Sequence, residues 1–378
     1  MRKRHSIIWF FIRLLVIPFL WLKFGYTFKV ARDLPKNYIV LSNHTTDYDP
    51  LLVGASFPRQ MYFVASEHIA RWKRAFKYLD YAFAPIIRYK GTVATSTVVE
   101  VLRRVRKGAN VCIFAEGART WDGVTGPILP STAKLIKNAG CGLVTYKIVG
   151  GHFISPMWSG RNTRRGYSRG TVVNVYTKER LAAMSQQEIY EAINRDLYED
   201  AYARQLVERK AYRGKGLAEG LENLLFICPE CGAHDTLFTE NDRIVCKGCN
   251  LVIKYNRYAA LDHAKFPTVK ALSDWQKEQI AVNLKNNVAY TAPYARLLTV
   301  RQHIETPVSD GPVTMTDEWL RCGEVQVAVA DISDMAMHGK HALVFTANNE
   351  YYELTAEKNV NMLKFWLLYN EVKSRITV

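Results

Sequence analysis

Six short apolar runs alternate with helical segments between Tyr38 and Gln205, and this alternation constrains the fold more than any other feature of the sequence. Several runs are apolar at every position, which is typical of strands covered by helices on both faces. One intervening helix is predicted from about Ala94 to Lys107, with Gly108 as its stop signal. The pattern predicts an α/β domain, a sheet flanked by helices. The six runs are YIVLS (38–42), MYFVA (61–65), APIIR (84–88), NVCIF (110–114), LVTYKIV (143–149) and TVVNVY (171–176).

Basic residues flank an apolar N-terminal segment, MRKRHSIIWFFIRLLVIPFLWLKFGY. Its apolar stretch from Ile7 to Leu22 is interrupted by Arg13 and Pro18, and its 16 residues fall short of the ~20 that a perpendicular crossing needs. We expect a helix that dips into one leaflet or is re-entrant, and no signal peptide, because no small-residue cleavage site follows. A buried core helix is the alternative. The residues expected at the membrane interface are Trp9, Trp21, Arg13 and Lys23.

Charge is distributed unevenly along the chain. The 51 Lys and Arg residues exceed the 35 Asp and Glu residues by 16, yet the stretch from Arg301 to Val378 carries a balance of −4. The residues before Arg301 therefore hold an excess of +20. Such a surface predicts an anionic partner, either nucleic acid or a membrane with acidic lipids. Because positive residues precede the apolar segment, we expect the protein on a membrane, at its cytoplasmic face.

A histidine and two aspartates follow the first apolar run, in SNHTTDYDPLL (42–52). A neutral imidazole can take a proton from an attacking hydroxyl when a carboxylate holds its other nitrogen. The order Asp49-Pro50 predicts a helix that is capped by Asp49 and has Pro50 at its first position. The preceding residues must then form a turn, which would bring Asp49 back to His44. Asp47 remains the competing partner.

Three further blocks make this region similar to the glycerolipid acyltransferases typified by lysophosphatidic acid (1-acylglycerol-3-phosphate) acyltransferase. The family's first motif, Asn-His, four residues and Asp, matches Asn43, His44 and Asp49. Its arginine-ended strand resembles APIIRYKG (84–91). Its Phe-Pro-Glu-Gly-Thr-Arg motif resembles FAEGAR (114–119), with alanine in place of the proline and the threonine. A fourth block, GLVTYKIVGG (142–151), lacks the family's usual prolines, and the resemblance covers roughly Tyr38 to Ser159.

The resemblance implies the fold of these enzymes and a specific reaction. His44 would be the general base and Asp49 its orienting partner, while an acyl thioester, acyl-CoA or acyl-ACP, would donate the fatty acyl group. The expected acceptor is a membrane lysophospholipid, in particular 1-acylglycerol-3-phosphate, so the reaction would belong to phospholipid synthesis. Where acyl-ACP is the donor, acyl carrier protein would be a partner. The resemblance also implies substrate-binding roles for Asn43, Arg88, Glu116, Gly117 and Arg119.

The third block supports this function on physical grounds. Gly117 allows a tight turn, so Glu116 and Arg119 would emerge at the carboxyl end of a strand, where open α/β sheets bind ligands. Arg119 can bind a phosphate through two parallel hydrogen bonds, and Glu116 can accept one from a glycerol hydroxyl. No nucleophile elbow is present and no cysteine lies beside His44, so we expect direct transfer between two bound substrates.

Two cysteine pairs, CPEC and CKGC, have the spacing of a zinc ribbon, with 14 residues between them. The residue after each pair, Gly232 or Asn250, tolerates the left-handed backbone conformation that such knuckles need. Four thiolates leave no open coordination position, so we expect a structural zinc ion. Iron is the alternative metal, and disulfides are disfavoured at a cytoplasmic face. The predicted ligands are Cys228, Cys231, Cys246 and Cys249.

Local signals suggest where the chain divides. Ser185 and Glu188 form a capping box for a helix that is expected to reach Gln205. The Lys- and Gly-containing stretch after it marks a boundary. Beyond Thr299, alternating runs and a final helix resemble a pleckstrin-homology-like β unit, with a protein partner, lipid sensing or self-association as its expected role. The predicted domains are a membrane-associated helix (1–30), an acyltransferase domain (31–206), a linker (207–224), a zinc ribbon (225–258) and a β-rich C-terminal module with a terminal helix (259–378).

Two other functions compete with acyl transfer. A catalytically inactive membrane adaptor would bind lipid through the α/β domain and recruit a protein through the ribbon module, and the alanines at 115 and 118 keep this alternative open. A nucleic-acid-binding ribbon is disfavoured, because acidic residues offset the basic ones around the cysteines and the N-terminus is hydrophobic. We therefore expect no nucleic-acid partner.

Overall fold

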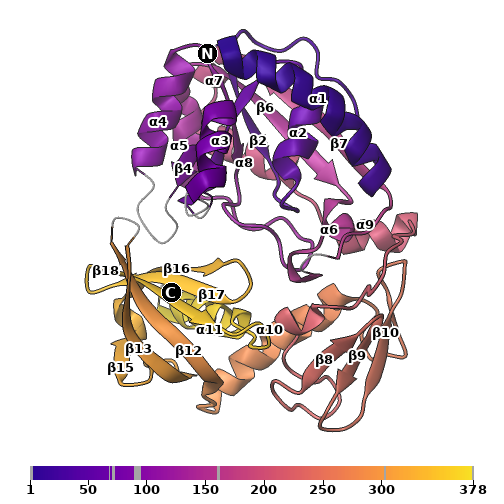
Figure 1. Cartoon of the computed structure of the whole chain (residues 1–378), viewed down its shortest axis with the longest axis vertical. Helices are drawn as coiled ribbons and strands as arrows, with labels where there is room; N and C mark the ends of the chain where they lie inside the picture. Colours follow the sequence, from indigo (N-terminus) through magenta and orange to yellow (C-terminus); the bar gives the residue numbers. More distant parts are fainter. Residues whose placement is uncertain are drawn as a thin grey trace. The chain divides into compact units, whose positions relative to one another are not determined.

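The computed structural model describes residues 3–67, 69, 73–88, 95–159, 162–301 and 304–376, which divide into two compact units (Figure 1). The first unit contains the described residues up to Lys215 together with Arg257–Ala259. The second contains Gly216–Asn256 and the chain from Ala260 onward. The predicted linker, 207–224, is thus shared between the two units.

The first unit is built on a seven-stranded sheet in the order β1-β7-β6-β2-β5-β3-β4. The strands from β6 to β4 run parallel, β7 is antiparallel to β6, and β1 pairs with β7 in parallel. The six predicted runs form six of these strands, and β1 was not predicted. The strands are β1 (Tyr26–Phe28), β2 (Tyr38–Ser42), β3 (Met61–Ser66), β4 (Ile86–Arg88), β5 (Asn110–Phe114), β6 (Gly142–Val149) and β7 (Ser168–Tyr176).

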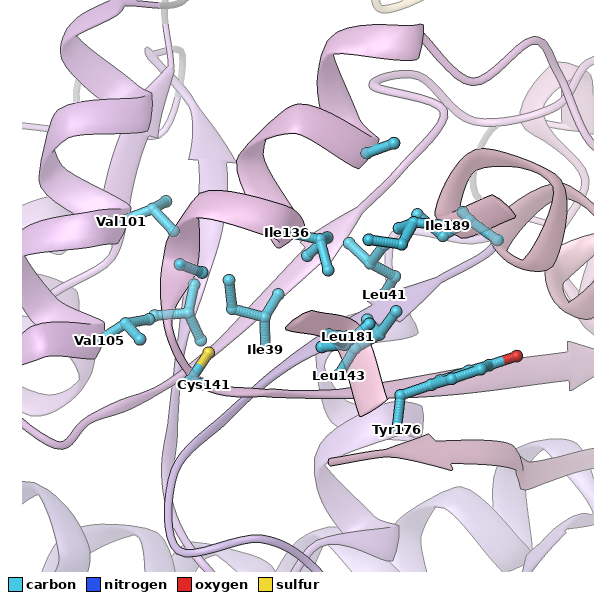
Figure 2. Packing of buried hydrophobic residues seen from close by; sticks show 14 of the residues in the cluster. Ile39, Leu41, Val101, Val105, Ile136, Cys141, Leu143, Tyr176, Leu181 and Ile189 are labelled. Atoms are coloured by element: carbon cyan, nitrogen blue, oxygen red, sulfur yellow. The ribbon is translucent and has the colours of Figure 1, made fainter. Parts of the chain in front are cut away.

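One face of this sheet is covered by α4 (Thr95–Arg106), α5 (Pro130–Ala139), α7 (Lys178–Ala183) and α8 (Gln186–Leu197). Figure 2 shows how Ile39 and Leu41 of β2 meet apolar side chains from these helices in the buried core. The alternate β2 residue, Val40, is also fully buried. A central strand that is apolar on both faces therefore lies between two helical layers, as its sequence predicts.

Capping signals fix the ends of several helices. Gly108 has a φ of 78°, in the left-handed region. The chain therefore turns away from the axis of α4 two residues after Arg106, the last helical residue. The capping box of Ser185 and Glu188 is present at the start of α8. The helix predicted to continue to Gln205 is instead interrupted, because α9 (Ala201–Glu208) begins anew with the Asp200 carboxylate accepting from the Ala203 amide.

The other face of the sheet carries α2 (Asp49–Ser56), and α1 (Lys3–Phe24) packs on α2 and on α3 (Lys73–Phe83) (Figure 1). Trp9 is 6% exposed and lies against Gly54 of α2, and the Arg13 guanidinium donates two hydrogen bonds to the Ala55 carbonyl oxygen. Both side chains were expected at lipid head groups. That prediction is wrong for both, because Trp9 packs against a glycine of α2 and Arg13 binds a carbonyl group near the end of that helix.

The opposite face of α1 is apolar and uncovered within the first unit. Within the described residues this is the one helix long and apolar enough to cross a membrane, with 22 residues and an 18-residue stretch of mean hydropathy 2.0, of which 17% is buried. Leu15 is 74% exposed. The helix therefore packs along one side on the first unit and exposes apolar residues along the other. The exposed large residues are Ile7, Phe10, Phe11, Leu14, Leu15, Phe19, Trp21 and Leu22.

The second unit combines two antiparallel sheets with two helices. A four-stranded sheet is formed by β8 (Leu237–Glu240), β9 (Arg243–Cys246), β10 (Val252–Tyr255) and β11 (Leu261–Asp262), and α10 (Val269–Lys285) follows it. The seven-stranded sheet has the order β15-β14-β13-β12-β18-β17-β16, and α11 (Leu363–Ile376) follows it. Its strands are β12 (Tyr290–Arg301), β13 (Ile304–Met315), β14 (Trp319–Cys322), β15 (Val325–Ala328), β16 (Ile332–His338), β17 (Ala342–Ala347) and β18 (Glu350–Ala356).

Polar contacts join the segment that contains the cysteines to both helices of the second unit. The Gln276 side chain of α10 accepts hydrogen bonds from the Phe226 and Ile227 amides, just before the first cysteine pair. The Lys364 ammonium of α11 pairs with the Asp235 carboxylate at 2.6 Å. The segments predicted as a separate ribbon and C-terminal module thus fold as one compact unit.

The packing of α1 on α2 predicts an unusual response to Gly54→Ala. A Cβ at this position would lie 2.6 Å from the Trp9 ring, so the substitution should destabilise the fold by about 1–3 kcal/mol through overpacking. In a Trp9→Leu background the same substitution should become neutral or stabilising, because alanine favours a helix over glycine by roughly 0.5–1 kcal/mol. Urea unfolding of the four chains measures both values, and a stabilising Gly54→Ala in the unaltered chain would contradict this packing.

Candidate functional site

The site lies where two neighbouring parallel strands end. The turn 43–48 follows β2, the loop 115–126 follows β5, and β2 pairs with β5 in parallel. The Ala115 amide donates to the Ser42 carbonyl at 3.2 Å, and the Thr120 amide donates to the His44 carbonyl at 3.0 Å. Two segments about seventy residues apart in sequence are thereby joined at the carboxyl edge of the sheet.

The imidazole of His44 is held by the carboxylate of Asp49. The distance from His44 Nδ1 to Asp49 Oδ2 is 2.8 Å, and the Asp49 side chain is fully buried. The amides and hydroxyls of Thr45 and Thr46 donate four more hydrogen bonds to the same carboxylate. The N-cap of α2 is Tyr48, so the prediction that Asp49 caps this helix is wrong by one residue. Its carboxylate serves the turn instead.

This contact fixes the tautomer of His44. A carboxylate that accepts from Nδ1–H leaves the lone pair of the neutral ring on Nε2. Among the described residues no hydrogen bond to Nε2 is found, and the side chain is 20% exposed. The Phe114 ring stacks on the imidazole with centroids 4.4 Å apart and an interplanar angle of 18°. Phe63 stacks on the Phe114 ring in turn, so an apolar wall orients the basic nitrogen.

Glu116 binds the backbone of the site. Its Oε1 accepts from the His44 amide at 2.6 Å, and its Oε2 accepts from the Gly126 amide at 2.6 Å. Burial raises the pKa of Glu116 to about 8, while the two amides favour its ionised form. The carboxylate therefore clamps the His44 turn to the loop after β5. A contact between Glu116 and a glycerol hydroxyl stays a prediction, and both carboxylate oxygens already have donors.

Two arginines lie at the same edge. The Arg119 guanidinium pairs with the Asp47 carboxylate at 3.2 Å, and Asp47 is 73% exposed whereas Arg119 is 14% exposed. Asp47, the competing partner for His44, is thus engaged with an arginine. Gly117 has a φ of 70°, and a Cβ there would lie 2.9 Å from Nη1 of Arg88. Glycine is required both for the turn and for the close approach of the Arg88 guanidinium.

Asn43 is placed differently from the other predicted residues. Its side chain exchanges two hydrogen bonds with the backbone of Ile148 in β6, at 2.9 and 2.8 Å, and it is 1% exposed. The amide therefore anchors the turn to the sheet, and a substrate contact by Asn43 stays a prediction. Sequence reasoning did not single out Thr45, Thr46 or Gly126, although two threonines between a histidine and an aspartate are a signal for an Asx- or ST-type turn.

The second unit holds the four predicted cysteine ligands in one cluster. All four sulfur atoms lie within 4.8 Å of one another. The distances are 3.7 Å between Cys228 and Cys249 and 3.8 Å between Cys231 and Cys246. A tetrahedral ion with ligand bonds of about 2.3 Å separates its sulfurs by roughly 3.8 Å. The cluster could therefore hold a metal ion.

The backbone around the cysteines also fits a metal site. Gly232 and Asn250 have φ values of 71° and 59°, which confirms the predicted left-handed positions after each pair. The Gly248 amide donates to Cys246 Sγ at 3.3 Å, and the Thr236 hydroxyl lies 3.3 Å from the same sulfur. Such donors stabilise thiolates that bind a cation.

The first unit places an oriented imidazole next to two arginines, an arrangement suited to proton transfer beside an anionic group. Residues 27–149 match the family model described as Acyltransferase, so this part of the chain is similar to that family. The matched range contains the His44–Asp49 pair and the loop with Glu116 and Arg119. No curated protein matches the chain closely enough to count as a relative.

Two solved structures resemble parts of the chain. The 1-acyl-sn-glycerophosphate (LPA) acyltransferase PlsC from Thermotoga maritima is 18% identical, with a TM-score of 0.43, over 55% of this chain and 85% of that chain. The N-terminal PH domain of human ARAP2 is 11% identical, with a TM-score of 0.19, over 23% of this chain and 81% of that chain. Likenesses of this degree assign no substrate or partner to the chain.

The clamp formed by Glu116 predicts a specific effect of Glu116→Gln. The new NH₂ group would face one of the two backbone N–H donors, leaving a buried amide unpaired at a cost of about 1–3 kcal/mol. Above pH 8, where Glu116 is ionised, we expect a lower free energy of unfolding and faster hydrogen exchange at Gly126 or His44. A residue that only accepts from a substrate hydroxyl would show unchanged stability and a raised KM. Glu191→Gln, on an exposed face of α8, is the control.

Proposed function

We propose that this protein transfers a fatty acyl group from an acyl thioester to the free hydroxyl of a lysophospholipid, with 1-acylglycerol-3-phosphate as the acceptor. The observation that carries the proposal is the His44–Asp49 pair, whose geometry leaves Nε2 as a base within an acyltransferase-family domain. The acyl donor is acyl-CoA or acyl-ACP, and the product belongs to phospholipid synthesis. Thioester and lysophospholipid are bound together, and the acyl group passes directly between them.

The reaction follows from the position of the base. Nε2 of His44 removes the proton from the acceptor hydroxyl as its oxygen attacks the thioester carbonyl carbon. The new carbon–oxygen bond forms, the carbon–sulfur bond breaks, and the thiolate leaves with the proton that the imidazolium returns. Asp49 stabilises the imidazolium during this step, because its carboxylate is held by four donors besides the ring.

The arginines supply the contact with an anionic acceptor. Arg88 and Arg119 lie at the edge where the acceptor hydroxyl must reach His44, and guanidinium groups bind phosphate through paired hydrogen bonds. The buried Nε of Arg88 makes no hydrogen bond within the part of the chain that the structure describes. A phosphate ester bound there would satisfy this donor and would compete with Asp47 for Arg119.

The position of α1 supports delivery of the acceptor from a membrane. Its carboxyl-terminal end touches the catalytic turn, since the Lys23 ammonium lies 2.9 Å from the Tyr48 hydroxyl and the Phe24 ring is 4.8 Å from the Tyr48 ring. The uncovered apolar face of α1 would lie in one leaflet, at the cytoplasmic face of the membrane. A lysophospholipid in that leaflet then lies beside the base.

Substitutions at the pair test this proposal. His44→Ala should lower kcat about 10²–10⁴-fold, because the general base is lost. Asp49→Asn should cause a loss of similar size, whereas Asp47→Asn should change kcat little and act mainly on KM through Arg119. The assay follows a labelled acyl thioester and a panel of lysophospholipids, with circular dichroism as the check on folding. Equal activity of His44→Ala and the unaltered chain would contradict the mechanism, and an inactive unaltered chain would favour the membrane adaptor.

For the second unit we propose a structural zinc ion on Cys228, Cys231, Cys246 and Cys249. Supporting this, the sulfur separations suit a small tetrahedral ion, and a site of four thiolates has no position for a substrate. We also propose that the seven-stranded sheet and α11 form a pleckstrin-homology-like module. The strand order and the terminal helix support this proposal. A protein partner or a second copy of the chain is its proposed ligand.

Removal of the metal ion should loosen the second unit and spare the first. A chelator should raise hydrogen exchange over residues 226–255, because the four-stranded sheet has few buried side chains to hold it without the ion. Exchange at the His44 turn should remain unchanged. Cys228→Ser should abolish binding of the one zinc ion per chain, measured by elemental analysis, and Cys322→Ser should not. Unchanged exchange after complete metal removal would exclude a structural role.

A further inference from the structure

A pocket of about 430 Å³ lies in the first unit, away from the His44 site. It is found where β3 and β5 begin, since Tyr62 is the second residue of β3 and Ala109 directly precedes β5. His44 and Glu116 follow the opposite ends of parallel strands in the same sheet. The pocket is thus at the amino edge of the sheet. Its lining residues are His5, Tyr62, Asp80, Ala84, Arg103, Arg104, Lys107 and Ala109.

The amino-terminal end of α1 helps to build this pocket. His5 Nδ1 lies 3.1 Å from the Tyr62 hydroxyl, and both side chains are buried. The Arg104 guanidinium lies over the Tyr62 ring at 4.5 Å and donates to the carbonyl oxygen of Ala84. Residues of α1, α3, β3 and α4 thus fix the walls, so the pocket is a feature of the packed unit.

The charge of the pocket is positive. Arg103 and Arg104 share the carboxylate of Glu100, which leaves the two arginines with one negative charge between them. Lys107 is exposed, and within the described residues its ammonium has no ion pair. Asp80 is the acidic residue in the lining. An anion with several oxygen atoms, such as a phosphate group, fits these donors.

We propose that this pocket binds the phosphate head group of an anionic phospholipid of the bilayer. A lipid is favoured over free phosphate because the uncovered apolar face of α1 begins next to the pocket. Its residues Ile7, Phe10 and Phe11 are 58–61% exposed. On α3, Tyr81 is 57% exposed and carries the Arg4 guanidinium 4.3 Å from its ring centroid. A head group in the pocket would therefore have apolar and aromatic side chains along which its acyl chains can lie.

This lipid is not the acyl acceptor, because the pocket and the base are at opposite edges of the sheet. The inference therefore holds whether or not acyl transfer is the reaction. A head group bound at the amino-terminal end of α1 would hold the helix flat against the leaflet, while its carboxyl-terminal end lies beside the catalytic turn. The expected result is tighter and oriented attachment to membranes that contain anionic lipid.

The test compares two charge reversals at adjacent positions. Lys107→Glu places an acid in the pocket, and Arg106→Glu makes the same charge change on the adjacent exposed residue outside it. Binding of the full chain is measured by flotation with phosphatidylcholine vesicles, with and without phosphatidylglycerol. Phosphatidylglycerol is chosen because it is neither acceptor nor product of the proposed reaction. Circular dichroism checks folding, and Lys107→Gln replaces Lys107→Glu if the latter misfolds.

We expect Lys107→Glu to weaken binding to the anionic vesicles at least about fivefold more than Arg106→Glu does, from the contribution of one basic residue at an acidic surface. Binding to phosphatidylcholine alone should be the same for both. Equal losses of vesicle binding in the two variants would show a general charge effect and overturn the proposed lipid site. Unchanged binding of both variants would overturn it as well. Inorganic phosphate that displaces the chain from vesicles at equal phosphate concentration would identify free phosphate as the ligand and refute the lipid assignment.

Discussion

The buried carboxylate of Asp49 is the interaction on which the site depends. A charged group with no exposed surface is stable only when its oxygens are satisfied, and here five donors from three consecutive residues surround it. Those donors can converge only if the chain from His44 to Thr46 closes into one turn before α2. The hydrogen bonds that stabilise the buried Asp49 carboxylate therefore also set the orientation of the imidazole.

Parallel pairing of β2 and β5 completes what the turn begins. Segments that follow adjacent parallel strands start at the same edge of the sheet and lie close together. The Glu116 carboxylate fixes their relative position by accepting hydrogen bonds from the backbone of both. Gly117 is needed so that the loop can turn and leave space for Arg88. The His44 turn and the loop after β5 are therefore held together by the fold itself, with the imidazole bound by Asp49 and Arg119 bound by Asp47.

The sequence predicts those features that depend on short-range order. The central runs, such as that of β2, could be predicted because buried parallel strands are apolar on both faces, and the contact between His44 and Asp49 is encoded within one turn. The clamp by Glu116 and the anchoring of Asn43 to Ile148 could not, because each needs the register between distant strands. The placement of Trp9 and Arg13 failed for a related reason, since apolar composition does not distinguish lipid from the surface of α2.

The length of α1 relates the two edges of the sheet. Twenty-two residues extend over roughly 33 Å at 1.5 Å per residue, enough to reach from His5 beside Tyr62 at the amino edge to Phe24 beside Tyr48 at the carboxyl edge. One face of this helix is occupied by the domain along that length, so a perpendicular crossing would strip Trp9 from Gly54 and Arg13 from Ala55. If α1 binds a membrane as proposed, retaining those contacts requires the helix to lie in the plane of the leaflet, and the turn that holds His44 then stays at the level of the lipid head groups.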